Sequence, residues 1–82
     1  MARVIITRAI ARLHTGGKVE HDVPGLKVRH IVRTLDERYP GIGRHLENGV
    51  AVAIDGVIHQ NAFLEEVGLD SEVAFMPAIE GG

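Results

Sequence analysis

The chain has 82 residues, of which 45% are hydrophobic and 24% are charged, and it contains no cysteine. This length fits one small domain, whose core buries only roughly 60% of the surface of the unfolded chain. The absence of cysteine excludes disulfides, thiolate metal sites and a cysteine nucleophile. The apolar run after Met1 is too short for a secretory leader or a membrane span. We therefore expect a globular protein of the cytoplasm with no membrane partner.

The charges are unevenly distributed along the chain. All nine Lys and Arg residues lie between Arg3 and Arg44 beside four acidic residues, a net charge of +5, whereas residues 45–82 carry seven acidic residues and a net charge of −7. Such a split can mark a partner surface, but we expect folding to interleave the two halves and neutralise most of the field. A negative total charge and 4% aromatic residues also argue against nucleic acid as a partner.

The first third of the sequence predicts two strands. Residues 3–9 are rich in β-branched side chains, which favour a strand. Gly16 and Gly17 supply the positive φ that a tight connection needs. Residues 18–23 then alternate as a half-buried strand does. Its predicted inner face consists of Val19, His21 and Val23.

One helix is predicted after the Pro24-Gly25 break. Its apolar residues recur at helical spacing and form a single stripe. Pro40 ends it, because the residue before proline avoids the helical region, and the segment 41–43 is interpreted as its stop. The helix start is poorly marked, with Gly25 as the best cap candidate. The stripe consists of Val28, Ile31, Val32, Leu35 and Tyr39.

The second half of the sequence predicts three further strands. Residues 49–56 form an apolar strand that ends in an Asp-Gly turn signal, and residues 57–60 are expected to pair back across that turn. Residues 61–69 are ambiguous, with a short 3₁₀ turn around Phe63. Residues 72–76 form the last strand.

This element order predicts an α+β fold of the β-grasp, or ubiquitin-like, type. A mixed sheet of about four to five strands would cover the apolar stripe of one main helix. We expect residues 1–77 to form this domain and residues 78–82 to form a flexible tail. Gly81 and Gly82 at the end of that tail offer no side chain to bury and have the most backbone freedom to lose on ordering. They contribute nothing to the fold, so the pair is either an ordinary frayed end or a functional element.

Four segments carry a resemblance to a known family, across essentially the whole chain. The chain resembles the small sulfur carriers of the MoaD/ThiS family. The segments are "LHTGG" at 13–17, "VRHIVRTLDERYPGI" at 28–42, "AIDG" at 53–56 and "SEVAFMPAIEGG" at 71–82.

The resemblance implies a mechanism. An adenylating enzyme uses ATP to join AMP to the C-terminal carboxylate, here that of Gly82. A sulfur donor then converts the acyl-adenylate to a thiocarboxylate, and the tail delivers this sulfur to an acceptor enzyme such as the large subunit of a molybdopterin synthase. The chain would be a carrier and not itself an enzyme, with no bound cofactor.

The tail residues fit this mechanism physically. Gly81 and Gly82 can thread a narrow channel in conformations closed to other residues, while Pro77 stiffens the approach. Met76, Ile79 and Glu80 are the predicted partner contacts. Alternation along the last strand leaves Val73 and Phe75 in the core.

Three positions depart from the family's pattern. Lys27 stands where the family commonly has Thr before the helix, and Asp55 stands where Asn usually precedes the turn glycine. Glu80 is larger and more charged than the small residues that the family favours there. This glutamate places a second anion near the reacting carboxylate, which is expected to slow attack on ATP or to select a particular partner.

Several alternatives remain open from the sequence. The tail resembles the molybdopterin-synthase type or the carrier of cysteine synthesis more than the thiamine carrier. A ubiquitin-like modifier conjugated through Gly82, or an interaction subunit with an inert tail, would share much of the pattern.

The five histidines are scattered and lack zinc-ligand spacing, so no metal is expected. Ser71, the only serine, lies in a predicted turn and is not expected to act as a nucleophile.

Overall fold

The computed structural model describes residues 1–47, 50–59 and 62–77. Gly49 and Gln60, which were expected at strand ends, and the predicted tail 78–82 lie outside the described residues. Eight elements follow one another along the described chain. They are β1 (Ala2–Ile5), α1 (Arg8–His14), β2 (Glu20–Val23), α2 (Val28–Arg38), α3 (Ile42–Glu47), β3 (Val50–Ile54), β4 (Val57–His59) and β5 (Glu72–Pro77).

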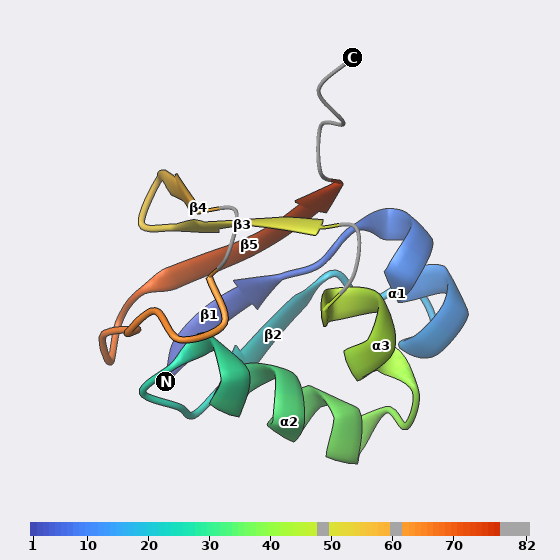
Figure 1. The fold of residues 1–82 in the computed structure, drawn as a ribbon. Coiled ribbons are helices and arrows are strands. Elements are labelled where there is room, and N and C mark those ends of the chain that lie inside the picture. The colour runs from blue at the N-terminus through green and yellow to red at the C-terminus, as the bar shows by residue number, and fades with distance from the viewer. Residues whose placement is uncertain (48–49, 60–61, 78–82) are drawn as a thin grey trace.

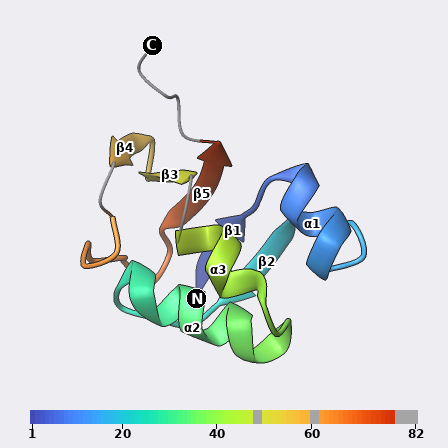
Figure 2. The same cartoon turned by 45° about the vertical axis from the view of Figure 1, so that its right-hand side comes forward.

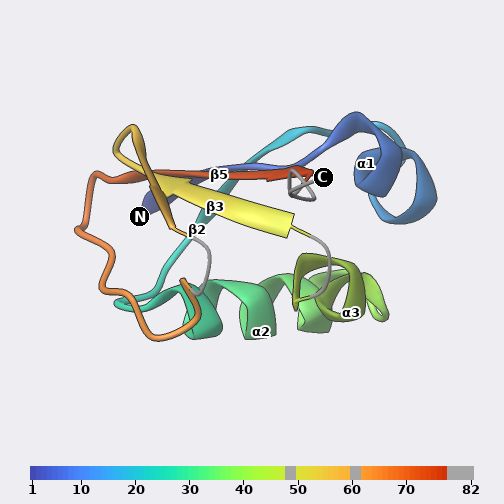
Figure 3. The ribbon, with the colours of Figure 1, turned by 45° about the horizontal axis from the view of Figure 1, so that its top comes forward.

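The strands form one mixed sheet in the order β2-β1-β5-β3-β4 (Figure 1). β1 and β5 are parallel, while the other neighbouring pairs are antiparallel. Helices α2 and α3 lie against one face of this sheet, and the opposite face carries no helix of the described chain (Figure 3). β4 is an edge strand of the sheet, and α1 lies far from it, at the right in Figure 2 where β4 is at the left. The β-grasp prediction is confirmed, with five strands.

The predicted stripe of α2 packs into the core. Val28, Ile31, Val32 and Leu35 are at most 2% exposed, and Tyr39, partly buried, follows the last turn of the helix as its C-cap. Val4, Val52, Val73 and Phe75 of the sheet belong to the same cluster. Val4, Val73 and Phe75 each lie between exposed or half-buried neighbours, whereas Val52 follows the buried Ala51. One face of the sheet and one stripe of the helix thus form a single core.

The start of α2 is stabilised by a distant loop, not by a capping side chain. The N-cap residue is Lys27, not Gly25, and its side chain makes no cap hydrogen bond. Two free amides of the first turn instead donate to loop carbonyls, Val28 N to Glu65 O at 3.1 Å and Arg29 N to Phe63 O at 3.0 Å. The loop therefore supplies the acceptors that a helix start requires, and the weak sequence signal at Lys27 is compensated by tertiary structure. A turn lies at residues 63–64, without the expected 3₁₀ helix.

The interpretation of residues 3–9 as one strand is wrong beyond Ile5. Thr7 caps a helix there, because its Oγ1 accepts a hydrogen bond from the amide of Ile10 at 3.1 Å. α1 then buries Ile10 and Ala11 on one side. The run of β-branched residues up to Thr7 predicted a longer strand, whereas Thr at an N-cap is itself a helix-start signal.

A second helix was also missed, at the segment interpreted as a stop. Gly41 does break α2, with φ of 99°, but α3 begins at the next residue and buries Ile42 and Leu46. Asp36 of α2 stabilises the start of α3. Its Oδ1 accepts hydrogen bonds from the amides of Gly41 at 3.2 Å and Gly43 at 2.9 Å. The prediction of one main helix therefore omitted two short ones.

The expectation that folding interleaves the two halves of the chain is wrong for the sheet. β1 and β2, from the basic half, occupy one side, and β3, β4 and β5, from the acidic half, occupy the other. The halves meet in the sheet only where β1 pairs with β5. Part of the charge asymmetry of the sequence is therefore retained in the folded protein.

Candidate functional site: the open face of the sheet and the end of β5

The predicted reactive tail follows β5, which occupies the middle of the sheet. Beyond Ala74, which pairs with Ile5 of β1, the strand continues against β3 alone, with Met76 opposite Ala51 and Pro77 opposite Val50. Pro77 is exposed and is the last described residue. Of the predicted site residues, Met76 and Pro77 are placed by the structure, whereas Ile79, Glu80, Gly81 and Gly82 lie outside the described residues.

Side chains of β5 alternate between the core and the open face. Val73 and Phe75 are 0% and 3% exposed, as expected from the sequence. Ala74 and Met76 are half-buried and point away from the core. The alternation is the period of two that a strand imposes. Met76 therefore lies beside the predicted tail without taking part in core packing.

Apolar residues from four strands form a patch on this open face. Ile5, Ala74, Ala53 and Ile58 lie opposite one another across β1, β5, β3 and β4, and paired residues project from the same side of a sheet. Met76 extends this row toward the end of β5. Ile58 is 60% exposed, and the other four are half-buried. We call Ile5, Ala53, Ile58, Ala74 and Met76 the outer patch.

The Asp55-Gly56 turn anchors the start of β5 against the β3–β4 hairpin. Both residues have positive φ, 49° and 85°, as in the tight hairpin turns that Asp-Gly favours. Asp55 Oδ1 accepts from the amide of Glu72 at 2.9 Å, and Oδ2 accepts from Ser71 Oγ at 2.8 Å. The bond from the Glu72 amide, and then that from Ser71, lowers the pKa of Asp55 below its ordinary value of 3.8. The Asp55 carboxylate thus links the β3–β4 turn to the start of β5 through hydrogen bonds, which an apolar side chain could not make.

Ser71 has a structural role in this network. Its Oγ donates to Asp55 and accepts from the amide of Gly68 at 2.8 Å.

Of the histidines, His14 and His45 lie with their ring centroids 4.9 Å apart. No group of three or more metal-ligating side chains occurs within residues 1–47, 50–59 and 62–77. In the same part of the chain, no helix is long and apolar enough to cross a membrane.

Comparison with known proteins identifies the family. The family model described as "ThiS family" matches residues 6–82. The molybdopterin synthase sulfur carrier subunit of Pyrenophora tritici-repentis is 31% identical over 81 residues, which cover 95% of this chain and 87% of that protein. This chain belongs to the ThiS family. It is a sulfur carrier of the MoaD/ThiS type, as the resemblance implied.

Solved structures agree with this fold. The chain is similar to a protein in the crystal structure of the BexX/CysO complex of Amycolatopsis orientalis, with a TM-score of 0.84, 24% identity and complete coverage of both chains. It is also similar to the small archaeal modifier protein 1 of Methanosarcina acetivorans, with a TM-score of 0.76, 19% identity and coverage of 99% and 95%. At these identities the likeness concerns the fold, which both share with this carrier.

Most of the outer patch was missed by sequence reasoning. Met76 was selected because it precedes the tail, but Ile5, Ala53, Ile58 and Ala74 were not. Their outward direction depends on strand register, which places residues of four separate segments in one row. The alternation within each strand carried a signal, but it could not show that the four outward-facing apolar positions lie side by side.

Proposed function

We propose that this carrier is activated at the carboxylate of Gly82. A partner enzyme joins AMP from ATP to that carboxylate with release of pyrophosphate, and a sulfur donor displaces AMP to give a thiocarboxylate. The tail then transfers the sulfur to an acceptor enzyme. Support comes from the family match, which extends to residue 82, and from the position of Pro77 at the exposed end of a central strand.

The fold suits this division of labour. The domain that precedes the tail is held by core packing and by the Asp55 network, so β5 is a fixed base for the residues that follow Pro77 in the sequence. A carboxylate becomes a useful acyl donor only when activation supplies a leaving group, and the adenylating enzyme must hold the reacting atoms at near-contact distance. Gly81 and Gly82 fit a narrow channel because neither has a Cβ, and Pro77 limits the conformational freedom lost on threading.

The outer patch is the proposed docking surface for the activating and acceptor enzymes. It is apolar, lies on the face of the sheet that α2 and α3 do not cover, and reaches Met76 next to the tail. Exposed apolar patches of this kind mark protein–protein interfaces. Met76, together with Ile79 and Glu80 of the tail, would guide the chain into the partner's channel. Because activation consumes ATP, we propose that the carrier works in the cytoplasm.

The central test is the intact mass of the protein after incubation with its adenylating enzyme, ATP and a sulfide source. We expect the mass gain of one oxygen replaced by sulfur, located by fragmentation on Gly82. Omission of ATP serves as the control and should leave the mass unchanged. A protein whose mass stays unchanged in the complete mixture would contradict the proposed chemistry.

Two finer points depend on other experiments. We propose that the acceptor is a molybdopterin synthase large subunit, because the relative at 31% identity is named a molybdopterin synthase sulfur carrier subunit. Cysteine and thiamine synthesis are the other candidate pathways.

The second candidate function is a protein modifier. It would share the activation step, and the likeness to an archaeal modifier protein supports it. Conjugates of this chain on other proteins in its host would support that second role.

A further inference from the structure

A groove on the helical side of the molecule is lined by three arginines. It has a volume of about 810 Å³ and lies where α2, α3 and the loop that caps α2 meet. Its basic residues are Arg29 and Arg33 on α2 and Arg44 on α3, and Phe63 of the loop forms part of its wall. The groove is remote from the outer patch, because the helices cover the opposite face of the sheet (Figure 3).

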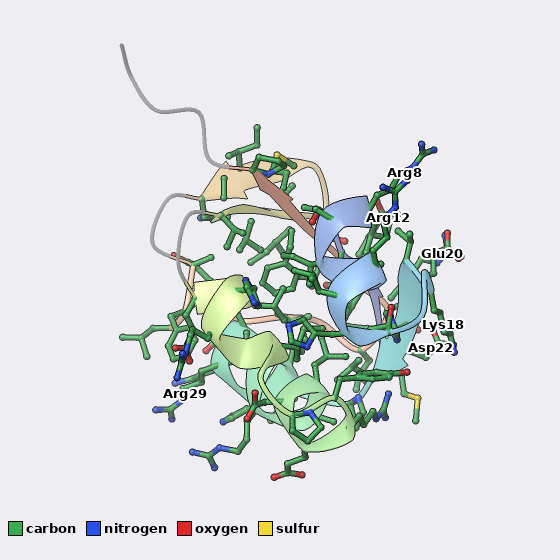
Figure 4. The ribbon with its side chains drawn as sticks, turned by 90° about the vertical axis from the view of Figure 1, so that its right-hand side faces the viewer. Arg8, Arg12, Lys18, Glu20, Asp22 and Arg29 are labelled. Carbon is green, nitrogen blue, oxygen red and sulfur yellow. The ribbon has the colours of Figure 1, made fainter. Side chains whose placement is uncertain are left out.

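The two arginines of α2 are available for a ligand. Arg29 and Arg33 are exposed, and four residues apart they project from the same side of the helix. Neither guanidinium pairs with another side chain in the part of the chain that the structure describes. Figure 4 shows Arg29 extending from α2, well away from Arg8 and Arg12 on α1.

The acidic residues near the groove are partly occupied elsewhere. Asp36 lines the groove, but its Oδ1 accepts from the amides of Gly41 and Gly43 at the start of α3. Glu65 of the neighbouring loop has its Oε1 3.8 Å from Nδ1 of His59, on β4. Glu47 lies on the α3 side of the groove. The α2 side of the groove therefore presents positive charge that no side chain among the described residues neutralises through a direct pair.

An apolar recess adjoins the basic groove. It has a volume of about 230 Å³, is lined mainly by aliphatic side chains of α2, α3 and β3, and shares Phe63 and Glu47 with the groove. Phe63 is 42% exposed, and its loop position is fixed by the hydrogen bond from the amide of Arg29 to its carbonyl. A ligand in the groove can thus place an apolar side chain beside its anionic groups.

We propose that this groove binds an acidic segment of a partner protein, with two carboxylates on Arg29 and Arg33 and an apolar side chain against Phe63. Guanidinium groups bind carboxylates in a planar, charge-assisted geometry. Glu47 and Asp36 line the same groove and confine an anion to its α2 side. That side fits the two carboxylates of a short acidic segment, whereas a continuous phosphate backbone would also meet Glu47 and Asp36, so a nucleic acid is disfavoured. Because the groove and the outer patch lie on opposite faces, one carrier can hold this partner while its tail is engaged by another enzyme.

The test is a titration of isotopically labelled protein with a capped peptide that contains two glutamates followed by a leucine. We expect amide shift changes at the groove, including Gly41 and Gly43, that weaken as ionic strength rises. The double variant Arg29→Gln/Arg33→Gln should raise the dissociation constant about tenfold, as expected for two partly exposed ion pairs. Arg8→Gln/Arg12→Gln is the matched control, since it removes the same charge from an exposed helix face and should bind like the parent.

Three results would overturn the proposal. They are equal weakening in both double variants, shift changes spread over all basic regions, and tighter binding of a single-stranded oligonucleotide than of the peptide at the same groove. Thermal melts of both variants confirm that each is folded. The outcome is separate from that of the proposed carrier function, because deletion of Gly81 and Gly82 should leave peptide binding unchanged. Likewise, the arginine variants should still form the thiocarboxylate.

Discussion

Leu35→Ala should destabilise the protein severely. Leu35 is 0% exposed and lies at the centre of the α2 stripe, in contact with the core cluster. Truncation of a buried leucine to alanine costs about 2–5 kcal/mol, because apolar contacts are lost and a cavity remains. At roughly 0.05–0.15 kcal/mol per residue, a domain of this length has a total stability of about 4–12 kcal/mol. The substitution therefore removes a large share of the free energy of unfolding.

The measurement is urea unfolding of the parent and the variant, followed by far-ultraviolet circular dichroism, together with a thermal melt. In a domain of this size each kcal/mol lowers the melting temperature by about 4–8 °C. Leu13→Ala is the matched control, because Leu13 is 68% exposed on α1 and its loss should change stability by less than about 0.5 kcal/mol. Equal effects of the two substitutions would refute the placement of the core.

Three further outcomes are expected. Thr7→Ala should cost about 0.5–2 kcal/mol in urea unfolding, because the amide of Ile10 loses its cap acceptor; an unchanged midpoint would show that the cap is dispensable. The lowered pKa of Asp55 means that its contribution to stability is present above pH 3.8 and is lost as pH falls below that value. Asp55→Asn should therefore flatten this loss in melts on either side of pH 3.8, and a parent-like pH profile would contradict the role of the carboxylate. Glu80→Ala should leave the melt unchanged and keep or quicken adenylation, since it removes an anion near the reacting carboxylate; an inactive variant would show that Glu80 makes a required contact.

Much of the fold could be predicted because its signals are local. The helical spacing from Val28 to Leu35, the Asp55-Gly56 turn and the alternation within β5 each depend on a few neighbouring residues. All three were found in the structure. α3 was missed for the opposite reason, because its start depends on Asp36, five or more residues before the amides that it accepts from. The start of α2 was misplaced for the same reason, because its first amides donate to carbonyls of a loop more than thirty residues later. α1 did carry a local signal, the Thr7 cap, which the β-branched run around it obscured.

The candidate site could be predicted only in part. The assignment of Pro77, Gly81 and Gly82 to a reactive tail stays a prediction, because Gly81 and Gly82 lie outside the described residues. The outer patch and the basic groove could not be found from one short segment. Each combines residues from several elements, and their proximity depends on strand register or on the packing of α2 against α3. The retained separation of charged halves likewise follows from strand order, which the charges themselves do not determine.

The most direct measurement of the carrier mechanism is ATP–pyrophosphate exchange with the cognate adenylating enzyme, using two tail variants. One variant lacks Gly82, and the other carries one alanine after it. Either change displaces the carboxylate by one residue, up to roughly 3.3–3.6 Å in an extended chain, whereas attack on a phosphate requires the reacting atoms at near-contact distance. We predict that exchange is abolished in both variants while their thermal melts match that of the parent. Exchange at the parent rate would contradict the assignment of Gly82 as the reactive end.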